Sequence, residues 1–272
     1  MMFKPDCTAF AMIQPSALPG SYRHEDKTID DIVKEVLEET QMIVDNGFDG
    51  VILQNMNDMP IKQIAAPEAI AYMTRIAYEI KHQYPQLILG VLVNWDGVAS
   101  LAVADAVHAD FVRVEHLFTG ANVTSAGILE GQCVEIAALR KRIRSKVPVY
   151  ADIQEVHGIP LGGKPIDDAA WEAVHEAFAD GLFVSGKSKE ESLEMIHAVR
   201  KKLPDTPVIL GGGANGENIE ELLQYYDGVS IATWVKNGNM KNPIDPKRAE
   251  IFMSSVQKAR KRSEERRVGK EC

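Results

Sequence analysis

The sequence predicts a single (β/α)8 TIM barrel of the α/β class, and three observations support that prediction. Short apolar runs alternate with amphipathic runs about eight times, a pattern typical of β–α units repeated around a parallel sheet. Nearly every apolar run ends in polar residues, as expected where ligands meet the carboxyl ends of barrel strands. The seventh run enters Gly211–Gly213, where such barrels commonly hold a phosphate. An open doubly wound sheet is the alternative, but it normally has fewer strands and a glycine signature in its first unit.

The apolar runs are expected to be the barrel strands. In chain order these are 9–13, 50–54, 87–93, 110–114, 147–153, 181–184, 208–210 and 228–232. The third run is continuous and rich in β-forming residues, as expected for a strand that is covered on both faces.

The amphipathic runs are expected to form the surrounding helices. The first begins at Thr28 or Asp30, either of which can cap it, and ends near residues 46–47 at an Asn-Gly stop signal. The run that follows the fifth strand is expected to use Asp167 or Asp168 as its cap. The expected helices are 28–46, 67–83, 130–144, 167–179, 189–202, 218–225 and 246–261.

Residues 1–261 are expected to form one barrel domain, because no linker or shift in composition divides them. The remaining residues 262–272 have no apolar periodicity and follow a complete domain. They resemble the in-frame translation of a common sequencing-library adapter, so we expect a non-structural tail that is an artefact. A genuine charged, frayed terminus is the alternative.

The bulk composition excludes several classes of protein. A net charge of −9 and a pI near 5.3 argue against a broad nucleic-acid surface, although a local basic pocket for a small anion is compatible with them. No apolar run is long enough to span a membrane and no signal-peptide core precedes the first strand, so we expect a cytoplasmic protein. Cys7, Cys133 and Cys272 are too scattered to suggest a zinc site or a disulfide framework. The sequence is compatible with a homo-oligomer.

Four side chains after the fifth and sixth strands are candidate catalytic groups: Asp152, Glu155, His157 and Lys187. Asp, Glu and His so close together could move protons near neutral pH or hold a divalent metal. No ligand spacing such as His-x-x-x-His supports a metal, so no metal ligand is assigned. Lys187 could balance a phosphate or act as a base if desolvated, and a solvated loop charge is the alternative.

A second set of polar residues at strand ends is predicted to bind the substrate: Asn55, Asn94, Asp96, Arg113 and Glu115. Arg113 and Glu115 are two residues apart and therefore lie on the same side of their strand. They could act on a ligand, and a mutual salt bridge that braces the barrel mouth is at least as good an interpretation. The convergence of polar strand ends on one rim favours a ligand site over chance.

The predicted phosphate site consists of Gly211, Gly212, Gly213, Ala232 and Thr233. Glycines that lie between an apolar strand and a helix start let backbone N–H groups approach an anion, with the helix dipole behind them. Glycines in that place are also common as simple turn residues, so both interpretations stay open.

Two glycine-containing stretches are expected to be loops. Residues 118–129 form a long one, and loops of that length are usually functional or disordered. Residues 158–165 nearly spell a P-loop, but Pro165 stands where a Ser or Thr hydroxyl would bind magnesium. The second stretch is therefore interpreted as a flexible lid over the barrel mouth and not as an ATPase site.

Motifs that are distributed over roughly residues 9–252 match those of a known family. They are Leu18-Pro-Gly-Ser21, Asn55 with Asp58-Met-Pro60, Val93-Asn94, Phe111-Val-Arg-Val114, Phe118-Thr-Gly-Ala121, Gly127-Ile-Leu-Glu-Gly131, Ala151-Asp152, Pro160-Leu161, Val184-Ser-Gly186, Gly211–Gly213 with Glu217-Asn218, and Asn242-Pro-Ile-Asp245. On these motifs the chain resembles the BtpA/SgcQ family of barrel proteins. Two positions depart from the family pattern: Gln14 stands where the family usually shows histidine, and Gln54 where it usually shows glutamate.

The resemblance implies a phosphate-binding barrel, while the names given to members of the family suggest different functions. They come from photosystem I biogenesis, from an operon of sugar-uptake genes and from a nucleotide-hydrolase label. The first hypothesis is therefore an enzyme that performs isomerase, epimerase or lyase chemistry on a small sugar phosphate. The second is a non-catalytic assembly factor that acts through a protein partner, with Gln14 and Gln54 as signs of lost chemistry. A hydrolase of nucleotides or phosphates is a third hypothesis.

Overall fold

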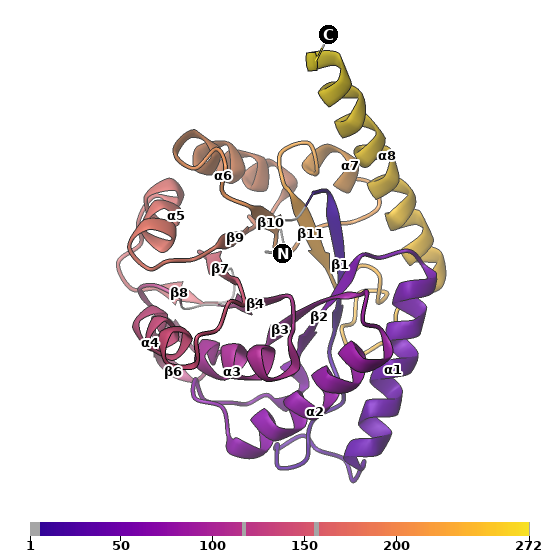
Figure 1. Cartoon of the computed structure of the whole chain (residues 1–272), viewed down its shortest axis with the longest axis vertical. Helices are drawn as coiled ribbons and strands as arrows, with labels where there is room; N and C mark the ends of the chain where they lie inside the picture. The colour runs from indigo at the N-terminus through magenta and orange to yellow at the C-terminus, as the bar shows by residue number, and fades with distance from the viewer. Residues whose placement is uncertain (1–5, 116–117, 155–157, 272) are drawn as a thin grey trace.

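The frame of the molecule is a closed barrel of parallel strands (Figure 1). The computed structural model describes residues 6–115, 118–154 and 158–271. Around the ring the strands follow the order β1-β11-β10-β9-β7-β4-β3-β2, so the first and last barrel strands close it. Their bounds are β1 Thr8–Ile13, β2 Gly50–Gln54, β3 Ile88–Leu92, β4 Phe111–Val114, β7 Val149–Ile153, β9 Gly181–Val184, β10 Val208–Leu210 and β11 Gly228–Ile231. The predicted (β/α)8 fold is confirmed.

The helices surround this ring (Figure 1). Their bounds are α1 Ile29–Asp45, α2 Pro67–Gln83, α3 Gly97–Val107, α4 Cys133–Ile143, α5 Ile166–His175, α6 Lys189–Lys202, α7 Ile219–Leu222 and α8 Pro246–Glu271. Thr28 caps α1 in a reciprocal capping box with Asp31. In α5 the cap position is Pro165, and Asp167 and Asp168 lie inside the first turn, so the expected Asp cap is wrong.

Two helices differ from the sequence-based expectation. The helix α3 was not expected, because its sequence is almost uniformly apolar and small and shows no polar face. The helix α8 runs to Glu271, so residues 262–271 are helical and not structureless. No helix in the part of the chain that the structure describes is long and apolar enough to cross a membrane.

A small antiparallel sheet stands beside the barrel. It is formed by β5 Ala121–Thr124, β6 Gly127–Glu130 and β8 Ile159–Pro160, with β5 in the centre. The stretch 118–129 is therefore largely a hairpin and not an irregular loop. The expected lid 158–165 contributes a strand to this sheet, and none of its residues lines the cavity at the barrel mouth.

The core has two layers, one inside the barrel and one between the strands and the helices. Alternate residues of each strand point inward, so each strand contributes to both layers. Four aromatic rings pack in the inner layer together with Met12, Ile52, Leu92 and Ile209. Phe111 lies edge-on to Phe10 at 5.2 Å and to Tyr150 at 5.5 Å between ring centroids. This aromatic layer forms the floor under the mouth of the barrel.

The ring of Tyr150 fits only because residue 181 has no side chain. A Cβ placed on Gly181 would lie 2.2 Å from Cε1 of Tyr150. We expect Gly181→Ala to lower the free energy of unfolding by about 1–3 kcal/mol, the usual effect of overpacking a core. The control is Gly163→Ala, where an added Cβ meets nothing within 4 Å. Equal stability of the two variants in urea denaturation would contradict this account.

Candidate functional site

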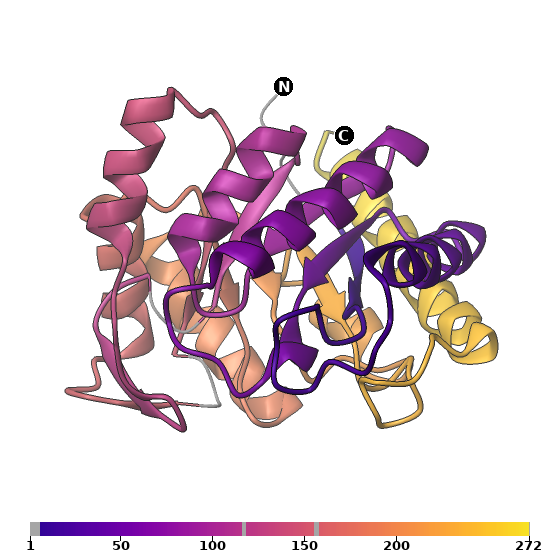
Figure 2. The same cartoon turned by 90° about the horizontal axis from the view of Figure 1, so that it is seen from below.

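A cavity of about 770 Å³ opens at the carboxyl ends of the barrel strands. The loops after β1 and β11 lie at the same edge of the molecule as the β5–β6 hairpin, which Figure 2 shows. The residues that line this cavity come from the ends of β1, β2, β4, β7, β9, β10 and β11 and from the loops that follow them. A cavity of this size is typical of small-molecule sites. We call it the mouth cavity.

The alternation of each strand brings the polar residues of the mouth cavity together. Inward-facing Phe111, Tyr150 and Phe183 are each followed two residues later by a polar side chain, namely Arg113, Asp152 and Ser185. Because the period of a strand is two, these polar side chains form the next layer above the aromatic floor. Convergence at the mouth therefore follows from the sequence pattern.

Arg113 and Asp152 form a buried, two-pronged ion pair at the base of the mouth cavity. Nε and Nη2 of Arg113 donate to the two carboxylate oxygens of Asp152 at 2.8 and 2.7 Å, and each side chain is only 7% exposed. The guanidinium also lies 4.4 Å above the ring of Phe183. These contacts hold the Arg113 fork rigidly. Glu115, the partner suggested by strand spacing, instead accepts a hydrogen bond at 2.8 Å from Gln54.

The glycines after β10 form one edge of the mouth cavity, with Ser185, Ala232 and Thr233 beside them. Within the described residues, the backbone N–H groups of Gly212 and Gly213 donate no hydrogen bond and are free to meet a ligand. A Cβ on Gly211 would lie 3.4 Å from Nη2 of Arg113 and from Oγ of Ser185, so this edge lies next to the ion pair.

The helix expected over 218–225 is present, but it is shorter than expected and does not follow the glycines directly. The helix α7 begins only at Ile219 and has four residues. The intervening turn is held by Asn215, whose side-chain oxygen accepts from the N–H groups of Glu217 and Asn218 at 2.8 and 2.9 Å. Any anion at this edge would therefore be held by the loop N–H groups and not by a helix dipole.

The remaining predicted catalytic residues have different placements. Lys187 lines the mouth cavity at its rim, with an exposed side chain. Glu155 and His157 lie outside the described residues. Among the described residues, no group of three or more His, Cys, Asp or Glu side chains is arranged to hold a metal ion.

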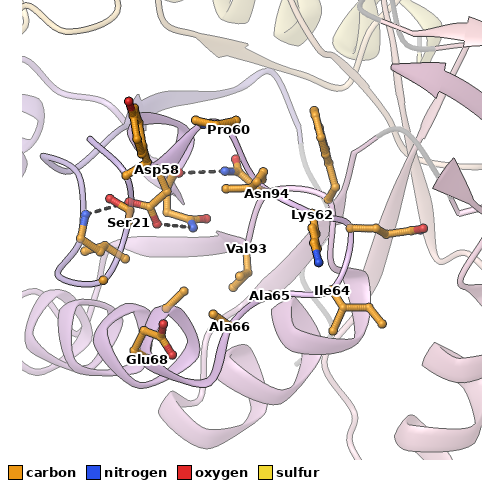
Figure 3. A pocket seen from close by; sticks show the side chains of 18 of the residues that line it. Ser21, Asp58, Pro60, Lys62, Ile64, Ala65, Ala66, Glu68, Val93 and Asn94 are labelled. Atoms are coloured by element: carbon orange, nitrogen blue, oxygen red, sulfur yellow. Dashed lines mark hydrogen bonds between the residues drawn. The ribbon is translucent and has the colours of Figure 1, made fainter. Parts of the chain in front are cut away.

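Three predicted substrate-binding residues do not line the mouth cavity. Asn55 and Asn94 line a separate cavity of about 260 Å³, which lies between the loops after β1, β2 and β3 (Figure 3). We call it the side cavity. Asp96 caps α3 through Ala99 N at 3.0 Å and also accepts from Ala65 N at 2.9 Å. The role of Asp96 in the structure is thus to hold α3 and the loop after β2.

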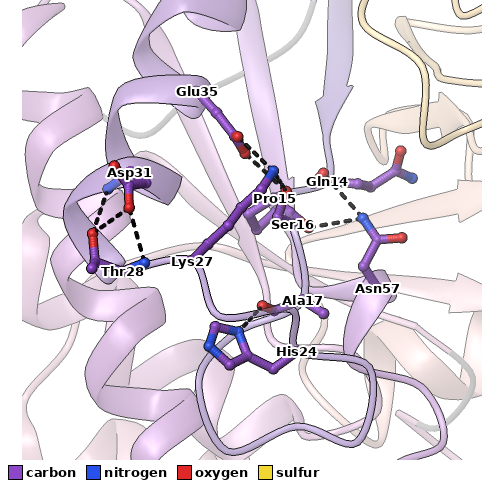
Figure 4. A network of polar contacts seen from close by, with 10 residues as sticks. All are labelled: Gln14, Pro15, Ser16, Ala17, His24, Lys27, Thr28, Asp31, Glu35 and Asn57. Atoms are coloured by element: carbon purple, nitrogen blue, oxygen red, sulfur yellow. Dashed lines mark hydrogen bonds and ion pairs between the residues drawn. The ribbon is translucent and has the colours of Figure 1, made fainter.

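A network of polar contacts fixes the first loop between the two cavities (Figure 4). Asn57 donates to the backbone carbonyls of Gln14 and Pro15 at 3.3 and 2.8 Å. Lys27 donates to Ser16 at 3.0 Å and pairs with Glu35 on α1 at 2.5 Å. These contacts hold Gln14 at the mouth cavity, which it lines.

Sequence reasoning missed one cation of the mouth cavity. Arg248, in the first turn of α8, lines it together with Trp234. Its Nη1 donates to the carbonyl of Trp234 at 3.0 Å, and its guanidinium lies 5.0 Å from the Trp234 ring. Arg248 is remote in sequence from every strand end except that of β11, so strand-end inspection did not find it.

Comparison with known proteins gives the family. The model of the BtpA family matches residues 6–258. The chain belongs to the BtpA family. An uncharacterized protein of Methanocaldococcus jannaschii is 36% identical over 91% of this chain and 94% of its own length. The photosystem I biogenesis protein BtpA of Synechocystis is 31% identical over 83% of this chain and 79% of its own.

Solved structures share the barrel of this BtpA-family chain. The native KDPGal structure superposes with a TM-score of 0.56 at 15% identity, covering 95% of this chain and 98% of the other. N-(5'-phosphoribosyl)anthranilate isomerase from Pyrococcus furiosus superposes with a TM-score of 0.53 at 17% identity, covering 92% and 98%. At these identities the likeness shows the fold alone.

Proposed function

We propose that the mouth cavity binds a small phosphorylated metabolite, a sugar phosphate, and performs proton-transfer chemistry of the isomerase, epimerase or lyase kind. The observation that carries this proposal is the pair of free N–H groups of Gly212 and Gly213 beside the buried Arg113–Asp152 pair. N–H groups that converge on a loop are a common way to hold a phosphate in this fold. The name of one structural neighbour, a phosphoribosylanthranilate isomerase, is in keeping with this assignment.

The proposed arrangement divides the mouth cavity into a phosphate edge and a reaction floor. The phosphate lies against Gly211–Gly213, Ala232 and Thr233, with Arg248 and Lys187 as nearby cations. The sugar then extends over Arg113, Asp152 and Glu115, whose polar atoms orient its hydroxyl and carbonyl groups. Asp152, Glu155, His157 and Lys187 are the candidate acids and bases, and one acid with one base suffices for these reactions.

A binding experiment tests the phosphate edge. A Cβ on Gly212 meets only Oγ of Ser185 within 4 Å, at 3.9 Å, so there is room for the Cβ of an Asp whose carboxylate adds a negative charge at this edge. We expect sugar phosphates to raise the melting temperature of the wild-type protein, and Gly212→Asp to abolish that shift. A ligand at a hundred times its dissociation constant adds about 2.7 kcal/mol of stability.

The matched control for this experiment is Gly163→Asp, an exposed site with free space around it. It introduces the same charge away from the mouth cavity and should leave the shift intact. A panel of sugar phosphates, nucleotides and inorganic phosphate that stabilises neither the wild-type protein nor the control would refute the proposal.

A protein-binding role is the second candidate, and one surface feature favours it. Ile128, Val123 and Ile159 lie opposite one another across β6, β5 and β8, and they are 65%, 39% and 71% exposed. An exposed apolar row on a small sheet is typical of an interaction surface. The name of the Synechocystis relative, a photosystem I biogenesis protein, agrees with such a role. A specific partner that is retained by Asp152→Asn but lost by Ile159→Asp would favour this function over catalysis.

A further inference from the structure

The side cavity is a separate compartment of the molecule. It shares no lining residue with the mouth cavity, and its walls come from the first loop, the loop after β2 and the end of β3 (Figure 3). Apolar side chains make up much of the wall, among them Leu18, Val93 and Trp95. An apolar cavity of about 150 Å³ can hold benzene, so a volume of about 260 Å³ has room for a larger flat ring.

One buried polar atom beside this cavity lacks a hydrogen-bond donor. Asn55 is only 3% exposed, and its Nδ2 donates to Oδ2 of Asp58 at 2.8 Å. A carboxylate can only accept, so this bond fixes the orientation of the amide. Within the described residues, Oδ1 of Asn55 then has no hydrogen-bond partner. Native proteins satisfy nearly all such buried acceptors.

The charges around the cavity favour a neutral occupant. Both oxygens of Asp58 are already used, because Oδ1 accepts from Leu18 N at 2.7 Å and Oδ2 from Asn55. Burial raises the pKa of this carboxyl, so its negative charge is already poorly solvated. Lys62 and Glu68, of opposite charge, are exposed at the rim. The interior therefore offers apolar surface and an acceptor, and no unpaired charge.

We propose that the side cavity is a second small-molecule site, distinct from the mouth cavity. It takes a neutral, flat, largely apolar molecule that carries one N–H or O–H group, and that group donates to Oδ1 of Asn55. Trp95 supplies an aromatic surface for the ring of the ligand. This inference stands independently of whether the mouth cavity binds a phosphate.

Two bicyclic probes that differ in one donor test the proposal. Indole carries an N–H group, whereas indene has nearly the same shape and none. In calorimetric titration of the whole protein, we expect saturable binding of indole and binding of indene that is about fivefold to tenfold weaker, the effect of one hydrogen bond to a buried acceptor. Absence of saturable indole binding, or equal affinity for the two probes, would overturn the proposal.

Filling the cavity provides the second arm of the test. Ala65 lines the side cavity, so Ala65→Phe should weaken indole binding at least tenfold. The control Ala126→Phe, at an exposed hairpin position, should not change it. Ala69→Leu, at another lining position in α2, replaces Ala65→Phe if that variant does not fold. Unchanged indole affinity in a folded filling variant would place the probe elsewhere and refute the assignment.

Discussion

Replacing Lys236 by methionine is expected to lower the free energy of unfolding by about 3–5 kcal/mol, the usual effect of stranding one member of a buried ion pair. Lys236 is 1% exposed, and its Nζ lies 2.7 Å from Oε1 of Glu39 on α1. Without the ammonium group, the Glu39 carboxylate stays in a site where its side chain is only 14% exposed. Guanidinium denaturation of wild type and variant measures the difference.

The double variant Lys236→Met with Glu39→Leu is the control for this prediction. It removes both charges and should recover most of the lost stability, because an apolar pair is often as stable as a buried ion pair. A single variant that loses less than about 1 kcal/mol, or a double variant no better than the single, would show that the pair is not what stabilises this contact.

The effect of Lys236→Met should depend on pH. Burial raises the pKa of Glu39 above its ordinary value of 4.5, and the charge of Lys236 opposes that rise. In the variant the opposing charge is gone, so the pKa rises further. A carboxyl with a raised pKa in the folded state loses stability as the pH rises through that pKa. The deficit in the free energy of unfolding relative to wild type should therefore be largest at pH 7 and shrink towards pH 4.5.

Replacing Arg113 should affect both stability and ligand binding. Arg113→Met leaves the buried Asp152 carboxylate unpaired and should cost about 3–5 kcal/mol. Arg113→Lys should restore only part of this, because an ammonium group cannot form the two-pronged bond or the same stack on Phe183. Denaturation curves of the two variants measure which of them is more stable.

Ligand binding should distinguish the effect of replacing Arg113 from that of replacing Lys236. Arg113 lines the mouth cavity, whereas Lys236 lies outside its lining. Stabilisation by a bound sugar phosphate should therefore be lost in Arg113→Lys, even where that variant is folded. It should persist in the double variant at positions 236 and 39. Loss of binding in both, or in neither, would contradict the proposed reaction floor.

Much of the fold and part of the candidate site could be predicted from the sequence because strand periodicity is short and local. The inward positions of β4, β7 and β9 alternate strictly, which brings Arg113, Asp152 and Ser185 to one cavity. The hairpin was missed because its alternation is reversed, with Asn122 buried and Val123 exposed. The third strand of the small sheet, β8, comes from residues that lie far from the hairpin in the sequence.

Three residues that were predicted for the ligand site lie elsewhere, and the reasons are equally local. Asn55 follows inward-facing Gln54 by one residue and so leaves the barrel on the opposite side. Asn94 has a φ of 31°, so the alternation of β3 does not continue through it. Asp96 was assigned to the ligand because the helix that it caps, α3, was not foreseen. In each case the local course of the backbone, which strand counting does not show, decides where the polar side chain lies.

The most direct test of the phosphate edge is the response of two backbone amides to inorganic phosphate. In ¹⁵N-labelled protein, we expect the amide protons of Gly212 and Gly213 to move downfield in a saturable way as phosphate is added, with Gly163 unchanged as an internal control. That result would place the anion on the loop after β10. Saturable shifts confined to other residues, or no saturable shift at all, would contradict the assignment of the mouth cavity.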